Sequence, residues 1–195
     1  MRGTEAALLV AFRRGDASAA EALLERYGDA LYTLAWRVTG APEAAAEAVQ
    51  EAMRAIESAD GEAEFGPWIR RRTARAAYRR VRAEAAAPPI AIDDVLPPID
   101  DDGHFEPLDD WSRQVGVPAA DSRLAPLVRA AIDALPPEDR TALVLSDVEG
   151  MDRRDVAAVL DIDEAAVMRR VHAARLFVRA RLARGLTPPG MEAAR

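Results

Sequence analysis

The chain contains no cysteine and only two histidines among its 195 residues. The absence of cysteine excludes disulfide bonds, thiolate zinc sites, redox pairs and cysteine nucleophiles. Because histidine is also scarce, we expect no metal site and no cofactor. No apolar run approaches the roughly 20 residues of a membrane span, and the N-terminus lacks the layout of a signal peptide. The sequence therefore predicts a cytoplasmic protein that does not insert into a membrane.

Lysine is absent as well, so every basic side chain is an arginine, and aromatic residues make up only 5% of the chain. Alanine is abundant, and both alanine and arginine have high helix propensity. The 50% hydrophobic content is enough for one ordinary domain or two small ones. A formal net charge of -7 argues against a uniformly basic protein that coats nucleic acid. The composition favours an all-α fold.

The N-terminal part of the chain, from Glu5 to about Arg82, has apolar residues at intervals of three and four. Gly15 and Gly40 are placed to end helices, and Asp16 is placed to cap the helix between them. Four helices fit this pattern: one over 5–14, one from the Asp16 cap to Gly40, one over 42–58 and one over 65–86. The pattern predicts a small unit of four helices.

Residues 87–122 differ in composition, with six prolines and with eight acids but no base between Asp93 and Asp110. Prolines remove backbone donors and like charges repel, so this stretch is interpreted as an acidic, Pro-rich linker. Apolar residues within it, such as Ile90 and Trp111, favour extended segments that dock on another surface. A solvated tether and a fold-back onto the arginines of 70–82 are the alternatives.

Helical spacing returns in the C-terminal part, with helices expected over 123–134, 138–149, 153–160 and 164–184. Only three residues separate the last two, which makes them a helix-turn-helix candidate. Asp161 stands where such turns usually have glycine, and aspartate is among the few other residues that tolerate a left-handed backbone. The sequence thus predicts two small helical domains joined by the acidic linker.

Two of the expected helices are rich in arginine and lack acids, because residues 68–82 contain seven arginines and residues 165–184 contain six. Each also has an apolar seam, which includes Trp68 in the first and Val167 in the second, so the arginines should point away from the core. Arginines on an exposed helix face bind phosphates through bidentate hydrogen bonds. DNA or RNA is therefore the favoured partner.

Two aromatic side chains of the first segment, Trp68 and Tyr78, add surface for stacking on unpaired bases. The alternative for Trp68 is a place in the core, and the alternative for the arginine faces is a solvated surface without a ligand. Two acid-free arginine helices, each closing a separate helical unit, favour nucleic-acid binding over a bare surface.

Several segments match, in order, the pattern of one known family. The N-terminal segments are RRGDASAAEALLERYGDALYTLAWRVTG, PEAAAEAVQEAMRAI with the pair Gln50 and Glu51, and FGPWIRRRTARAAYRRVR with Trp68 and Ile69. The C-terminal segment is ALPPEDRTALVLSDVEGMDRRDVAAVLDIDEAAVMRRVHAARLFVRARL. The first set resembles region 2 and the last resembles region 4 of extracytoplasmic-function (ECF) sigma factors, the group IV members of the sigma-70 family. These proteins direct bacterial RNA polymerase to promoters.

The resemblance implies a division of the chain and a set of partners. Residues 1–86 would be region 2, 87–122 the linker, 123–186 region 4 and 187–195 a tail. Region 2 would grip the clamp helices of the largest subunit of core RNA polymerase and open the -10 element of promoter DNA. Region 4 would dock on the flap of the second-largest subunit and read the -35 element. An anti-sigma factor is a further expected partner.

The resemblance also implies three groups of site residues. The -10 element would be bound by Trp68, Arg71, Arg75, Tyr78, Arg79 and Arg82, next to a pocket formed by the loop 58–64. The -35 element would be read by the exposed side of the last helix, with Ala165, Ala166, Arg169, Arg170 and Ala173. Arg169 or Arg170 either reads a guanine edge or clamps phosphate. Core polymerase would be bound by Glu47, Gln50 and Glu51.

Several positions depart from the family pattern. Polar or acidic residues of the family are replaced by Ala44 to Ala46 ahead of the Gln-Glu pair, by Arg75 and Arg79, and by Ala166, Met168 and Ala173 in the last helix. Either the promoter preference differs or DNA reading is weakened. The alternative function is therefore a sigma-like regulator that binds an anti-sigma factor or polymerase without productive promoter recognition.

An enzymatic or calcium-binding function has a single candidate segment, 100–104. On a calcium loop, Asp100, Asp102 and Gly103 take the third, fifth and sixth positions, but Pro98 takes the first and Asp109 the twelfth. The chain also has no phosphate-binding glycine loop and no nucleophile elbow. We expect that the protein is not an enzyme and has no catalytic residues.

Overall fold

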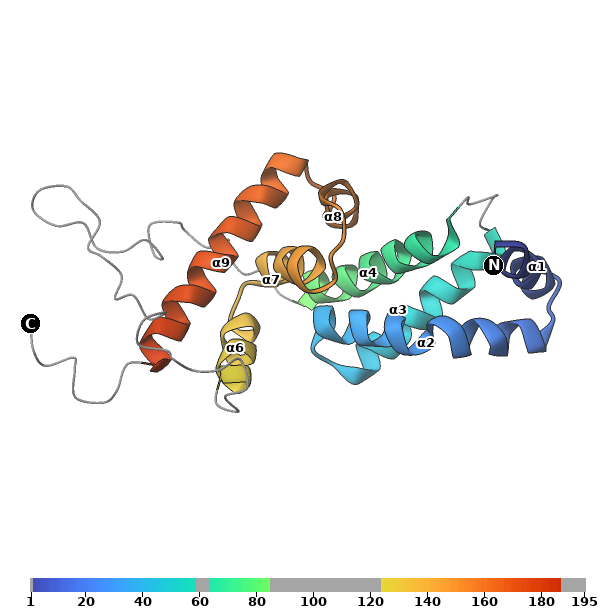
Figure 1. The fold of residues 1–195 in the computed structure, drawn as a ribbon, viewed down its shortest axis with the longest axis horizontal. Helices are drawn as coiled ribbons and strands as arrows, with labels where there is room; N and C mark the ends of the chain where they lie inside the picture. Colours follow the sequence, from blue (N-terminus) through green and yellow to red (C-terminus); the bar gives the residue numbers. More distant parts are fainter. Residues whose placement is uncertain (1, 59–63, 85–123, 187–195) are drawn as a thin grey trace, which may run out of the picture.

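The computed structural model describes residues 2–58, 64–84 and 124–186 of the chain. Within these ranges every regular element is a helix and no strand occurs, so the prediction of an all-α fold is confirmed (Figure 1). The expected linker over 87–122, the centre of the loop over 58–64 and the tail over 187–195 lie outside the described residues.

The described N-terminal half consists of α1 (Arg2–Arg13), α2 (Ala17–Thr39), α3 (Pro42–Arg54), the 3-10 helix η1 (Ala55–Ser58) and α4 (Phe65–Glu84). Both ends of α2 follow the prediction. Asp16 accepts a hydrogen bond from the Ser18 amide at 2.9 Å, and Gly40, at φ 71°, donates its N–H to the Trp36 carbonyl. Two hydrogen bonds lower the pKa of Asp16, and the one from the Ser18 hydroxyl has a larger effect than the one from the Ser18 amide. The helix expected over 42–58 is α-helical only to Arg54.

The C-terminal half consists of α6 (Leu124–Asp133), α7 (Pro137–Leu143), the π-helical segment η3 (Val144–Val148), α8 (Arg153–Leu160) and α9 (Glu164–Leu186). The prediction of one regular helix over 138–149 is wrong in its second half. There the turn widens, and the Glu149 amide reaches back to the Val144 carbonyl at 2.9 Å. This wide turn fixes where Glu149 lies at the end of η3.

The turn between α8 and α9 has the conformation that the sequence predicts. Asp161 adopts a left-handed backbone with φ 58° and ends α8. Asp163 then caps α9, because its carboxylate accepts a hydrogen bond from the Ala166 amide at 2.5 Å. Helices α8 and α9 therefore form a helix-turn-helix whose turn consists of residues 161–163.

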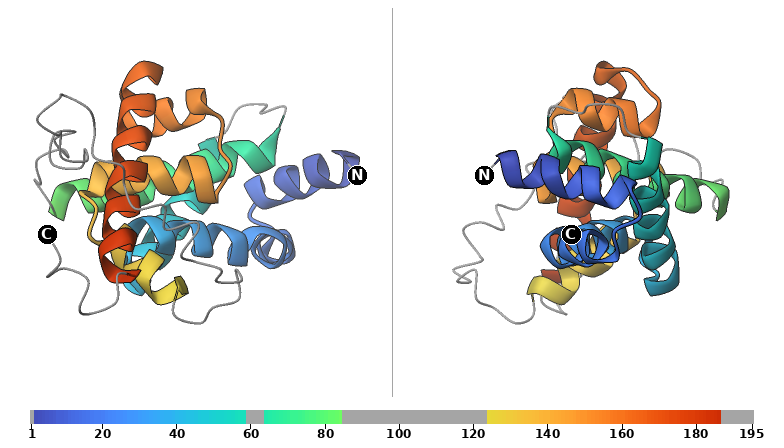
Figure 2. Two further views of the ribbon diagram at one scale, coloured as in Figure 1. Left: turned by 60° about the vertical axis from the view of Figure 1, so that its left-hand side comes forward. Right: turned by 90° about the vertical axis from the view of Figure 1, so that its right-hand side faces the viewer.

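Each half has a simple packing scheme. In the N-terminal half α2, α3 and α4 pack against one another, and α1 lies on α2 and η1. In the C-terminal half α6, α7 and α8 all pack on the long helix α9 (Figure 2). The largest fully buried side chains are Leu23, Leu31, Leu34, Ile56, Ile69, Leu145 and Leu160.

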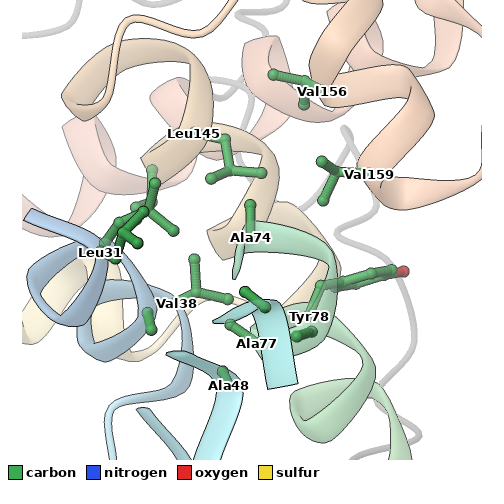
Figure 3. Packing of buried hydrophobic residues seen from close by; sticks show 14 of the residues in the cluster. Leu31, Val38, Ala48, Ala74, Ala77, Tyr78, Leu145, Val156 and Val159 are labelled. Carbon is green, nitrogen blue, oxygen red and sulfur yellow. The ribbon is translucent and has the colours of Figure 1, made fainter. Parts of the chain in front are cut away.

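The two halves share one hydrophobic core. Helix α4 contacts both α8 and α7, and one cluster of buried side chains runs through all of them. Figure 3 shows Leu145 and Val159, from the C-terminal half, beside Val38 and Ala74 from the N-terminal half. The units that the sequence predicts as separate are therefore in direct apolar contact.

The left-handed residue of the helix-turn-helix gives a stability prediction. Replacement of Asp161 by alanine should lower the free energy of unfolding by about 1 kcal/mol, because a Cβ strains this backbone and alanine lacks a polar group to compensate. Replacement by glycine should preserve stability. Urea denaturation followed by circular dichroism compares the two variants. Equal losses in both would contradict the backbone explanation and would point to a role for the carboxylate itself.

Candidate nucleic-acid interface

The arginine-rich helix α4 has one buried side, as its apolar seam predicts. The residues on that side are Phe65, Trp68, Ile69, Thr73, Ala74, Ala76, Ala77, Tyr78 and Val81, all of them buried. The Thr73 hydroxyl is satisfied within the helix by the Ile69 carbonyl at 2.9 Å. The seven arginines occupy the remaining surface, so the seam determines which side of α4 is available to a ligand.

The two aromatic residues expected to stack on bases are both in the core. Trp68 is 5% exposed, packs on Phe65 with ring centroids 5.8 Å apart, and carries the guanidinium of Arg72 at 5.4 Å from its ring. Tyr78 is 3% exposed and donates a hydrogen bond to Glu138 of α7 at 3.2 Å. Burial, reinforced by the charge of Glu138, raises the pKa of Tyr78. Neither ring is available for stacking in this arrangement.

Three arginines of α4 form ion pairs with acids of the C-terminal half. The pairs are Arg70–Glu149 at 3.2 Å, Arg71–Asp155 at 3.2 Å and Arg82–Glu138 at 4.0 Å. The alternative of a simply solvated arginine surface does not hold for these three. The acids come from helical segments 138–155 and not from the predicted linker, whose proposed fold-back lies outside the described residues.

Two arginines of α4, Arg72 and Arg75, are exposed and have no acid partner among the residues that the structure describes. They lie between two hollows. One of about 260 Å³ is lined by Glu51, Ala52, Ala55, Arg72, Arg75 and Arg79, and one of about 240 Å³ by Trp68, Arg71, Arg72, Arg75, Ala158 and Val159. Of the arginines predicted for the -10 element, Arg75 is therefore exposed without an acid partner among the described residues, whereas Arg71, Arg79 and Arg82 are ion-paired.

The residues expected to bind core polymerase lie together on α3. Glu47 and Gln50 are exposed, and Glu51 is half-buried. Glu51 pairs with Arg79 and, at 2.9 Å, with Arg80 of α4, and Glu47 lies 3.4 Å from Arg80. The predicted polymerase-binding surface and the predicted -10 surface are thus connected by ion pairs.

The five residues expected to face the -35 element lie on the first turns of α9, and they differ in their exposure to solvent. Ala165 and Arg169 are exposed, and Ala166 is half-buried. The expectation that Arg170 and Ala173 lie on the exposed side is wrong. Ala173 is 5% exposed, because it shares the inward side of α9 with the apolar seam.

Arg170 is directed toward α7. It pairs with Asp139 at 3.0 Å and also with Glu138, and Asp139 is only 2% exposed. A buried carboxylate needs such a partner, because the charge has lost most of its water. Arg170 therefore fastens α9 to the start of α7.

Two exposed residues of α9, Met168 and His172, belong to the accessible side and are absent from the predicted contact set. They are one helical turn apart, so they lie on the same side as Ala165 and Arg169. Met168 is among the exposed large apolar side chains of the protein. The i, i+4 spacing was the signal that could have identified them.

The described residues hold no group of histidines and acids arranged to bind a metal ion. No described helix is long and apolar enough to cross a membrane. The segment 100–104, considered above as a calcium loop, lies outside the described residues.

Comparison with protein families identifies both halves. The model for Sigma-70 region 2 matches residues 23–87, and the model for Sigma-70, region 4 matches residues 126–178. Together the two matches cover more than half of the chain. The region 2 match contains α4, and the region 4 match contains α8 and the first part of α9.

Two curated proteins are similar in sequence. The ECF RNA polymerase sigma factor SigE of Mycolicibacterium smegmatis is 42% identical over 64 residues, which is 33% of this chain and only 25% of that protein. The ECF RNA polymerase sigma-E factor of Haemophilus influenzae is 27% identical over 181 residues, covering 90% of this chain and 93% of that protein. The second alignment runs through both halves.

A solved structure shares the fold. It is the sigma factor RpoE in complex with the anti-sigma factor NepR from Bartonella quintana, with a TM-score of 0.53 and 19% identity. The superposition covers 83% of this chain and 95% of that one. With region 2 and region 4 matched in order, and α4 and α8 inside the respective matches, the chain belongs to the sigma-70 family as an RNA polymerase sigma factor of the ECF type.

Proposed function

We propose that this sigma factor directs core RNA polymerase to promoters that carry -10 and -35 elements and assists melting at the -10 element. The observation that carries the proposal is the exposed side of α9 in a helix-turn-helix, on the same chain as the arginine helix α4. A helix with exposed residues after a tight turn suits the major groove of duplex DNA. A basic helix beside a melted strand suits phosphate binding.

The -35 element is read by the exposed side of α9, formed by Ala165, Met168, Arg169 and His172. The Arg169 guanidinium has the fork geometry that recognises a guanine edge or clamps a phosphate. Met168 offers an apolar contact for a thymine methyl group. Arg170 and Ala173 act indirectly, by holding α9 in its orientation.

The -10 strand is held by Arg71, Arg75, Arg79 and Arg82 on the exposed surface of α4. Arg75 makes the first contact, because the other three are engaged by acids. Trp68 and Tyr78 support this surface from within the core.

The proposed partners follow from the same assignment of separate roles to the two halves. Glu47, Gln50 and Glu51 on α3 bind the clamp helices of the largest polymerase subunit, and the C-terminal unit binds the flap of the second-largest subunit. An anti-sigma factor is proposed as a further partner, since the similar sigma factor RpoE was solved in complex with one. The site of action is the cytoplasm, where polymerase and promoter DNA meet.

The proposed domain limits are 1–86 for region 2, 87–122 for the linker, 123–186 for region 4 and 187–195 for the tail. The family matches over 23–87 and 126–178 support the two domain assignments.

The second candidate function is a sigma-like regulator that binds polymerase or an anti-sigma factor without productive initiation. The capture of Arg70, Arg71 and Arg82 by acids of the same chain favours it, because these arginines are then withheld from DNA. Run-off transcription distinguishes the two functions, since only a sigma factor yields transcripts.

The first prediction concerns initiation. Core polymerase supplied with this protein should produce run-off transcripts from a promoter library, and the active promoters should share two upstream elements. Core binding without any transcript would contradict the proposed function and support the regulator.

Replacement of Arg169 by alanine should lower transcription from -35-dependent promoters by about tenfold, as expected for loss of one base or phosphate contact. Arg179→Ala is the matched control, because it removes the same charge from an exposed position farther along α9.

The second prediction separates the two neighbouring arginines of α9. Arg170→Ala should lower the free energy of unfolding by about 2 kcal/mol, because it removes one charged hydrogen bond from the buried Asp139 carboxylate. Arg169→Ala should change it by no more than about 0.5 kcal/mol, because its side chain is exposed. Urea denaturation measures both. Similar losses for the two variants would show that the assigned orientations of these side chains are incorrect.

A further inference from the structure

Helix α1 precedes the part of the chain that the Sigma-70 region 2 model matches, because that match begins at residue 23. The helix nevertheless packs on α2 and η1, and it lies at the end of the N-terminal half where α3 passes into η1 (Figure 1). Leu8, Leu9 and Phe12 pack against the core. Two polar residues of α1, Glu5 and Arg13, form hydrogen bonds to other elements, and these bonds indicate its role.

The C-terminal end of α1 is hydrogen-bonded to η1. The Nε of Arg13 donates to the Ile56 carbonyl at 3.2 Å, and the Ile56 side chain is fully buried. Carbonyl groups in the last turn of a helix lack a partner within that helix, so a donor from outside stabilises them. Element η1 is therefore held from two sides, by its own apolar side chain in the core and by the guanidinium of α1.

The N-terminal part of α1 is linked to the start of α4 through Tyr27 of α2. The Tyr27 hydroxyl donates a hydrogen bond to the Glu5 carboxylate. The Tyr27 ring meets the ring of Phe65, the first residue of α4, edge to face, with centroids 5.3 Å apart. Burial, reinforced by the bond to Glu5, raises the pKa of Tyr27 to about 12, so its hydroxyl remains a donor at neutral pH. Glu5 therefore holds Tyr27 against the first turn of α4.

The elements held by α1 form the walls of the hollow of about 260 Å³ beside Arg75. One wall contains Ala55 of η1, and the other contains Arg72 and Arg75 of α4. Both arginines are exposed, and neither has an acid partner in the part of the chain that the structure describes. No described residue of α1 lines this hollow. The position of η1 relative to α4 determines how a strand in the hollow meets the two arginines.

We propose that Glu5 and Arg13 are positioning residues for the -10 strand, because they hold η1 and the start of α4 at the spacing in which Arg72 and Arg75 receive it. The inference deepens the proposed function and rests on it, since it takes α4 to be the strand-binding helix. Neither positioning residue touches the strand. Supporting contacts of this kind keep the groups of a binding site in their productive geometry.

The test variant is Glu5→Ala, Arg13→Ala, which removes both hydrogen bonds and leaves the net charge unchanged. Arg14→Ala, Glu25→Ala is the matched control, because it removes the same two charges from exposed positions of the same half. The conservative variant Glu5→Gln, Arg13→Lys keeps an acceptor and a donor in the same places. Circular dichroism shows whether each variant is folded. If the test variant is not, the single variants Glu5→Ala and Arg13→Ala replace it, and each should show part of the same loss.

The first measurement is initiation by core polymerase with each variant, followed as the permanganate reactivity of unpaired thymines in the -10 element. The test variant should lower this reactivity by about tenfold relative to the control, as expected when a site loses its supporting contacts. The conservative variant should remain close to the parent. Equal reactivity of the test variant and the control would overturn the proposal, and so would an equally large loss in the conservative variant.

A double-mutant cycle distinguishes positioning from a general loss of stability. It uses the affinity of the polymerase-bound protein for a single-stranded DNA oligonucleotide. The test variant should bind about tenfold more weakly than the control. With Arg72→Ala, Arg75→Ala already in place, the groups to be positioned are absent, so the same α1 substitutions should cause no further loss. A further loss of the same size would overturn the proposal.

Run-off transcription by the parent distinguishes failure of this proposal from failure of the proposed function. If the parent initiates transcription but the α1 substitutions act independently of Arg72 and Arg75, the proposed function stands and the positioning role is refuted. If the parent gives no transcripts but the oligonucleotide cycle shows the expected dependence, the positioning role stands and the regulator replaces the sigma factor.

Discussion

The pairing of arginine with carboxylate across the two halves is the interaction on which the observed arrangement depends. Glu149 is nearly buried between Arg37 and Arg70, and Arg71 holds Asp155 on the adjacent helix. A nearly buried carboxylate is costly unless its partners remain in place, so the position of α8 against α4 is fixed by charge as well as by apolar contact. Which arginines of α4 are left without an acid partner depends in part on this contact.

The use of arginine as the sole basic side chain has a physical consequence for such a surface. Its planar guanidinium binds carboxylates and phosphates with similar geometry, whereas lysine acts as a point charge. The same helix can therefore be satisfied by acids of its own chain or by a nucleic-acid backbone. The net charge of -7 conceals this balance, because acid-free helices and acidic segments alternate along the sequence. Free binding to DNA and binding within a polymerase complex are then expected to differ.

Local features of the fold were predictable from the sequence because they depend on neighbours within one or two turns. The caps at Asp16 and Gly40, the left-handed Asp161 and the range of α8 agree with the prediction. The π-helical segment η3 was missed, because a widened turn leaves the apolar spacing almost unchanged. Within the candidate site, the sequence correctly predicted the seam of α4 but not the burial of Ala173, since the exposed arc of a helix depends on how many neighbours pack on it.

The sequence by itself determined the all-α class, the order of the two helical units, the arginine content of α4 and α9, and the family. Only the tertiary structure decided which of those arginines are engaged. Arg70 and Glu149 are 79 residues apart, and no periodicity relates them. Ion pairing depends on distances of a few ångströms between atoms that only packing brings together. For the same reason Arg169 and Arg170, adjacent in sequence, differ in environment, since one faces solvent and the other faces the carboxylate of Asp139.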